Sequence, residues 1–154
     1  MILTIRILLL FTLTLSSIPV RAEYIMDAAT EKLADCGDIM AYAANFALIK
    51  NNEGQARVFI FQQSRAVTAL FLKNNVNEII AGERAEAWKA RSPATKRYLD
   101  ANQANLPNII NGCYPIIQHA VDERIVQTGR LWGKSFADLV ETMAAGTRAQ
   151  FGIR

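Results

Sequence analysis

Cys36 and Cys113 carry the only thiols in the chain, and these are its most reactive side chains. Neither cysteine belongs to a C-x-x-C motif, and neither has a histidine within a few residues. Two cysteines in an exported chain allow one intramolecular pairing. We therefore predict a structural disulfide between them, with a reactive thiol or a pair of metal ligands as the alternatives. Closing so long a loop would stabilise the fold by roughly 4 kcal/mol.

His119 is the only histidine, so any Ser-His-Asp or Cys-His catalytic arrangement must use it. We interpret Ser64 as a helix-surface residue and Ser92 as a capping residue. His119 and Glu123 are four residues apart on one predicted helix face, a spacing that can hold a metal ion. Two such ligands on an exposed helix are a weak signal, so we expect a solvated pair beside Asp122 and no metal.

Carboxylates are the other route to catalysis, because a glycan-cleaving enzyme needs two of them across a cleft. Asp35 and Asp38 share one helix side, and so do Glu83 and Glu86. Pairs on the same helix do not form a cleft, and the sequence does not pair residues across helices. A hydrolase or lyase that acts on a cell-wall polymer is therefore the alternative function, not the expected one.

A haem could take its axial ligands from His119 and one of the methionines Met26, Met40 and Met143. The chain has no C-x-x-C-H motif for covalent attachment. Met40 also falls on the predicted core stripe, where a methionine that fills a gap is expected. We predict no cofactor, and carriage of haem or of another small ligand stays as a further alternative.

Residues 84–98 combine five basic side chains with two aromatic ones. Arginine and large aromatic residues are enriched at the energetic centres of protein interfaces. The candidate binding residues here are Trp88, Arg91, Arg97 and Tyr98. The alternative is an ordinary solvated helix face, because Glu83 and Glu86 offset part of the charge.

A second candidate binding segment runs from Arg130 to Lys134, with the sequence Arg-Leu-Trp-Gly-Lys. An aromatic side chain in a kink beside glycine is often exposed and available for binding. Arg130 and Trp132 are the candidates in this segment. Trp132 also continues an apolar helical stripe, so packing in the core is the alternative.

The first residues resemble a secretion signal. Arg6 is the single charge before an apolar run over 7–15, and Val20-Arg21-Ala22 supplies a signal-peptidase site. We predict a cleavable signal peptide over 1–22, cut after Ala22, and a single α-helical domain over 23–154. The apolar run is too short to span a bilayer core of roughly 30 Å, although a retained anchor is the alternative.

Composition narrows the compartment and the partners. The chain has 17 basic and 14 acidic residues, and removal of Arg6 and Arg21 with the leader leaves it nearly neutral. A nucleic-acid-binding domain usually carries a strongly basic surface, so we expect no nucleic-acid partner. Beyond the leader, no segment approaches the roughly 20 apolar residues of a membrane helix. The predicted location is periplasmic or secreted, since disulfides persist in oxidising compartments.

Apolar residues recur at steps of three and four along nearly the whole chain, which predicts an all-α bundle of five or six helices. The first three helices are expected at about 25–50, 55–73 and 77–90. Ser92 followed by Pro93 resembles an N-cap and a proline at the first helical position. We therefore predict a separate short helix from this pair through Ala104.

The last apolar stripe runs from Ile110 to Met143. One helix of that length would be about 50 Å long at 1.5 Å per residue, too long for a compact domain. We predict a break between Thr128 and Lys134, with a restart capped by Ser135 and Asp138. The disulfide would then join the first helix to the helix that starts near Asn108.

These patterns favour a non-catalytic exported protein that binds another protein of the cell envelope. An inhibitor or immunity protein, or an accessory subunit of an envelope complex, would fit. A homodimer is left open. The prediction depends on the lack of a recognisable catalytic set and on the disulfide-linked scaffold.

Overall fold

The structure, a computed structural model, describes residues 26–73 and 77–153. Its elements in chain order are α1 (Ala28–Ile49), α2 (Glu53–Leu72), α3 (Glu78–Ala101), the 3-10 turn η1 (Gln103–Asn105), α4 (Leu106–Asp122), α5 (Arg124–Thr128), β1 (Arg130–Leu131), β2 (Lys134–Ser135) and α6 (Phe136–Gln150). The predicted all-α bundle with one disulfide is confirmed. The predicted signal peptide and its cleavage after Ala22 lie outside the described residues.

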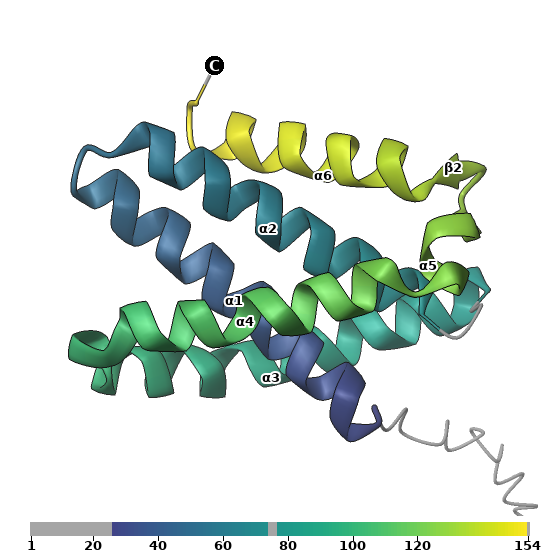
Figure 1. The fold of residues 1–154 in the computed structure, drawn as a ribbon, viewed down its shortest axis with the longest axis horizontal. Coiled ribbons are helices and arrows are strands. Elements are labelled where there is room, and N and C mark those ends of the chain that lie inside the picture. The colour runs from purple at the N-terminus through teal and green to yellow at the C-terminus, as the bar shows by residue number, and fades with distance from the viewer. Residues whose placement is uncertain (1–25, 74–76, 154) are drawn as a thin grey trace, which may run out of the picture.

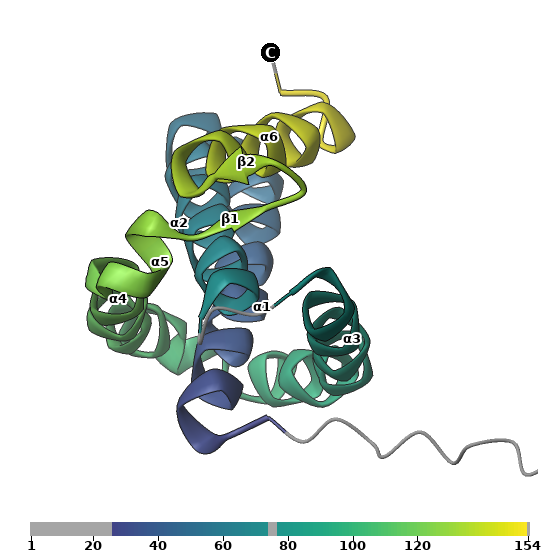
Figure 2. The same cartoon turned by 90° about the vertical axis from the view of Figure 1, so that its right-hand side faces the viewer.

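The antiparallel pair α1 and α2 forms the centre of the bundle (Figures 1 and 2). Helices α3 and α4 pack on opposite sides of α1, and α6 lies along α2 (Figure 2). Small side chains allow α1 and α2 to approach closely. At Gly37 an added Cβ would lie 3.3 Å from Val67 Cγ2, so this position has almost no spare room. The largest fully buried apolar side chains are Leu33, Met40, Ile60, Leu70, Leu99, Ile117 and Val126.

Aspartate and asparagine side chains cap the starts of the first three helices. Asp27 accepts a hydrogen bond from the backbone N–H of Thr30 at 2.8 Å, and this bond lowers the pKa of Asp27. Asn52 and Asn77 cap α2 and α3 in the same way. Asn51, which separates α1 from α2, adopts φ +56°. Asparagine tolerates this left-handed conformation better than most residues.

The predicted helix boundary at Ser92 and Pro93 is wrong, because α3 continues through both residues. A proline inside a helix leaves the carbonyl four residues earlier without its donor. The helix nevertheless persists, since α3 contacts α1 on both sides of Pro93. The Ser92 hydroxyl lies 3.0 Å from Asp38 Oδ1 and 3.2 Å from the Trp88 carbonyl oxygen. Ser92 therefore bonds across to α1 instead of capping a new helix.

The predicted break between Thr128 and Lys134 is confirmed as a hairpin turn, and Ser135 with Asp138 forms the predicted capping box of α6. A second break was not predicted: α4 ends at Asp122 and Glu123 is extended. Glu123 pairs there with Lys73 at 2.6 Å, fifty positions earlier in the chain. The apolar period continues from Val121 to Ile125, so it could not reveal the end of α4.

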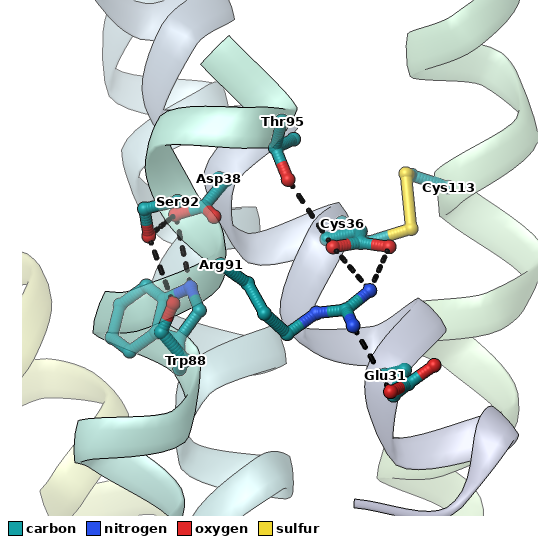
Figure 3. A network of polar contacts seen from close by, with 9 residues as sticks. Glu31, Cys36, Asp38, Trp88, Arg91, Ser92, Thr95 and Cys113 are labelled. Atoms are coloured by element: carbon teal, nitrogen blue, oxygen red, sulfur yellow. Dashed lines mark hydrogen bonds and ion pairs between the residues drawn. A yellow bond between two sulfur atoms is a disulfide. The ribbon is translucent and has the colours of Figure 1, made fainter. Parts of the chain in front are cut away.

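The predicted disulfide joins Cys36 of α1 to Cys113 of α4, with their Cα atoms 5.4 Å apart (Figure 3). Both cysteines are buried. Helix α4 begins at Leu106, slightly before the expected start near Asn108, and Pro107 occupies its first turn. Proline is well tolerated there, since the first N–H groups of a helix have no intrahelical partner.

Candidate protein-binding surfaces

Two of the predicted binding residues, Trp88 and Arg91, are directed toward α1 (Figure 3). The Arg91 guanidinium lies 3.0 Å from a carboxylate oxygen of Glu31 and 3.0 Å from one of Asp35. The Thr95 hydroxyl donates to the same Asp35 carboxylate at 3.2 Å. These contacts tie α3 to α1, so the Arg91 guanidinium is engaged within the fold.

Asp38 joins the same two helices one turn further along. Its Oδ1 accepts hydrogen bonds from Trp88 Nε1 at 2.9 Å and from the Ser92 hydroxyl at 3.0 Å (Figure 3). Its Oδ2 is buried and has no hydrogen-bond partner among the described residues. Burial raises the pKa of Asp38 above its ordinary value, although both hydrogen bonds act in the opposite direction.

The raised pKa of Asp38 predicts a pH-dependent cost in stability. Below the unfolded pKa, near 3.8, both folded and unfolded chains hold the proton and the cost is zero. As the pH rises through the higher folded pKa, the folded state must lose a proton that it holds more tightly, and stability falls. Asp38→Asn should therefore gain stability relative to the wild type between about pH 4 and pH 7, measured by urea unfolding across that range.

Asp100 supplies a control of opposite sign. It is exposed, and hydrogen bonds from Lys96 and Tyr42 lower its pKa. Its stabilising effect is complete above the unfolded pKa, near 3.8, and is lost as the pH falls below that value. Asp100→Asn should therefore be less stable than the wild type by a nearly constant amount from about pH 4 to pH 7. A difference between Asp38→Asn and the wild type that stays constant with pH would contradict the prediction for Asp38.

The other members of the basic segment divide into one buried and several exposed side chains. Arg84 is only 2% exposed, and its Nη1 donates to the backbone carbonyls of Leu70 and Lys73 at 2.8 and 2.6 Å. Arg97 and Tyr98 are exposed on the last turns of α3, Tyr98 by 53%. They lie about 15 Å along the helix from Trp88, so the segment does not form one continuous binding patch.

The second candidate segment folds as a tight hairpin with Trp132 at its tip. Trp132 and Gly133 have φ values of +50° and +72°, which are the signs that a type I′ turn requires at both central positions. Trp132 is 53% exposed, so only about half of its surface is packed against the rest of the fold. The Trp132 ring still packs edge to face against the Phe71 ring, with the ring centroids 6.3 Å apart at an interplanar angle of 81°.

The hairpin is held firmly on both sides of this tryptophan. Leu131 is buried beneath it, while Arg130 is exposed. The Lys134 ammonium donates to the Thr142 hydroxyl at 3.0 Å. Asp138 completes the cap of α6, and its hydrogen bond from the Ser135 hydroxyl lowers its pKa.

The residues weighed as metal and haem ligands do not gather. Along the described ranges there is no group of three or more histidine, cysteine, aspartate or glutamate side chains that could hold a metal ion. His119 and Glu123 do line one groove, where Glu123 pairs with Lys73, but no third such ligand joins them among the described residues. Met40 is fully buried in the core, and the Met143 sulfur accepts a hydrogen bond from Thr68.

Several grooves lie between the helices of the described ranges. One, about 560 Å³, runs between the α1–α2 turn and the start of α4 and is lined mainly by apolar side chains such as Phe59 and Ile110. A second, about 500 Å³, lies between α1 and α3. A third, about 220 Å³, lies between α2, α3 and α6. The first two have the size of small-ligand sites, which keeps ligand carriage as an alternative function.

The polar interface between α1 and α3 was missed by sequence reasoning, although it has a signal. Glu31, Asp35 and Asp38 recur at steps of four and three along one side of α1. The side chains that meet them on α3 follow the same period and include Trp88 and Arg91. Two complementary polar stripes at helical spacing indicate a helix pair joined by polar contacts.

Comparison of the chain with known protein families, curated proteins and solved structures finds no match. Within 26–73 and 77–153, no helix has both the length and the apolar character that a membrane span requires. A functional proposal therefore depends on the geometry of the surfaces described above.

Proposed function

We propose that this chain is an exported protein that binds a protein of the cell envelope through a surface centred on Trp132. An inhibitor or immunity protein, or an accessory subunit of an envelope complex, fits this role. The observation that carries the proposal is a large aromatic side chain, about half exposed, at a turn position with φ +50°.

The left-handed conformation of Trp132 costs free energy that an asparagine or glycine would largely avoid. Such residues dominate the central positions of type I′ turns, whereas other residues there cost on the order of 1–3 kcal/mol. The edge contact with Phe71 offsets about 0.5–1.5 kcal/mol of this. A strained and exposed tryptophan supports a role in binding.

The surroundings of Trp132 suit a binding hot spot. Tryptophan and arginine are the residue types most enriched at such positions, and Arg130 is exposed on the same hairpin. The buried Leu131 and the capped α6 restrain the turn, so binding would order few additional groups. The Cys36–Cys113 disulfide supports the location, since such bonds persist in oxidising compartments.

Trp132→Asn tests this proposal. The tagged wild-type protein should recover a stoichiometric partner from a fractionated envelope extract, and Trp132→Asn should recover at least tenfold less because a hot-spot truncation costs about 2 kcal/mol or more. The variant should keep its fold, since relief of the turn strain offsets the lost contact with Phe71. The affinity of the purified partner for both proteins is then measured by calorimetry.

Tyr98→Asn is the matched control, because Tyr98 is as exposed as Trp132 but lies at the end of α3. It should bind the partner like the wild type. A partner that is lost with Tyr98→Asn and retained with Trp132→Asn would contradict the proposed surface. A monomer that recovers no partner and releases soluble fragments from cell-wall glycan would overturn the proposal in favour of the hydrolase.

A further inference from the structure

The groove between α2, α3 and α6 lies next to the Trp132 surface. Phe71 packs against the Trp132 ring and also lines this groove. Its other apolar walls come from Val67 of α2, Trp88 of α3 and Met143 of α6. The groove therefore brings Trp88, one of the residues predicted from sequence, onto a surface continuous with Trp132.

Gln63 gives the groove a polar group without a partner. Gln63 is one of the lining residues, and its Oε1 is buried with no hydrogen-bond partner in the described part of the chain. A buried acceptor without a hydrogen bond destabilises the free protein. The terminal torsion of glutamine is broad, so a small rotation can turn Oε1 toward a donor that enters the groove.

The size and charge of the groove define what it can accept. At about 220 Å³ it is smaller than the roughly 300–1,000 Å³ of most small-molecule sites, so it suits a single side chain. No charged residue is among the described residues that line it. A charged side chain would lose its hydration there without a counter-charge, whereas a neutral aromatic side chain would not.

Gly146 keeps the groove open on the α6 side. A Cβ added at this glycine would meet no other atom within 4 Å. Glycine inside a helix is destabilising relative to alanine, and here packing within the chain would leave room for a side chain. A larger residue would leave the fold intact and extend over the groove.

We infer that this groove receives a tyrosine side chain of the partner protein, with the aromatic ring against Phe71, Trp88 and Met143 and the hydroxyl donating to Gln63. This inference rests on the proposed function, because it places the partner's tyrosine beside the Trp132 contact. Trp132 would thus contact the partner, while a tyrosine of the partner enters the neighbouring groove.

The groove is tested without the partner by titrating the isotope-labelled protein with N-acetyl-tyrosinamide at millimolar concentration. The amide NMR signals of Phe71, Gly146 and neighbouring residues should shift. N-acetyl-phenylalaninamide, which lacks only the hydroxyl, should bind about tenfold more weakly, the worth of one hydrogen bond. Gln63→Met should abolish this preference. Absence of the shifts, or equal binding of the two probes, would overturn the inference.

Gly146→Leu and Gly112→Leu form a matched pair for the partner itself. Gly112 is exposed on α4, and an added Cβ there also meets nothing within 4 Å. Gly146→Leu should block both the probe and the partner, whereas Gly112→Leu should block neither. Partner binding that survives Gly146→Leu but not Trp132→Asn would overturn the groove assignment and leave the proposed function intact. A protein without any partner would overturn the proposed function, while the probe titration would still report on the groove.

Discussion

Replacing Cys36 and Cys113 together by alanine should lower the free energy of unfolding by about 4 kcal/mol. The disulfide closes a loop of 77 residues, which strongly limits the conformations of the unfolded chain. Both cysteines are also buried between α1 and α4, so each alanine removes packed sulfur. A loss of this size is comparable to the whole stability of many small domains.

Urea unfolding with and without reductant measures this effect. The double variant should unfold at a lower urea concentration than the oxidised wild type, and reductant should shift the wild type toward the variant. Mass spectrometry should show the gain of two hydrogens in the reduced wild type. A single unfolding midpoint shared by the variant, the reduced wild type and the oxidised wild type would contradict the prediction.

Arg84→Met should lower the free energy of unfolding by about 3 kcal/mol, the second-largest effect we expect. The buried guanidinium donates to the carbonyls of Leu70 and Lys73, where the last carbonyls of α2 have no intrahelical donor. Its positive charge also lies favourably at the negative end of the helix dipole. Methionine keeps most of the side-chain volume but leaves these carbonyls unpaired.

Arg97→Met is the matched control, because it removes an exposed arginine from the same helix. Its effect should stay within about 0.5 kcal/mol, as for most surface substitutions. Arg84→Lys should fall between the two, since an ammonium keeps the charge but lacks the fork that spans two acceptors. Equal unfolding midpoints for Arg84→Met and Arg97→Met would show that the buried contacts add no stability.

The features that the sequence predicted correctly depend on interactions within a few residues. Ser135 with Asp138 caps α6 through bonds that span three positions. The Cys36–Cys113 disulfide joins distant residues, but it could be predicted because two cysteines allow only one intramolecular pairing. Local chemistry and simple counting were sufficient in these cases.

The wrong predictions all involve contacts between distant residues. Ser92 and Pro93 carry a strong local start signal, yet Asp38 on another helix holds Ser92 in the middle of α3. The apolar period runs on past the end of α4, where Glu123 pairs with Lys73 at the end of α2.

The candidate site shows the same limit. The apolar stripe places Trp132 at a helical step, whereas the hairpin that follows α5 places it at a turn. Trp132 is exposed because it occupies the turn. Gly129 and Gly133 indicate a break in the sequence but not the exposure of the tryptophan. The contact with Phe71 and the shared groove with Trp88 join residues from three separate segments. The aromatic residues could therefore be selected from sequence, whereas the surface that unites them could not.

The position of the disulfide also determines the order of events during biosynthesis. Cys36 leaves the ribosome 77 residues before Cys113, so α1, α2 and α3 are complete in sequence before the bond can form. With two cysteines, oxidation cannot produce a mispaired intramolecular isomer. Maturation of this chain therefore requires an oxidant but no disulfide isomerase, and it cannot finish until α4 has been made.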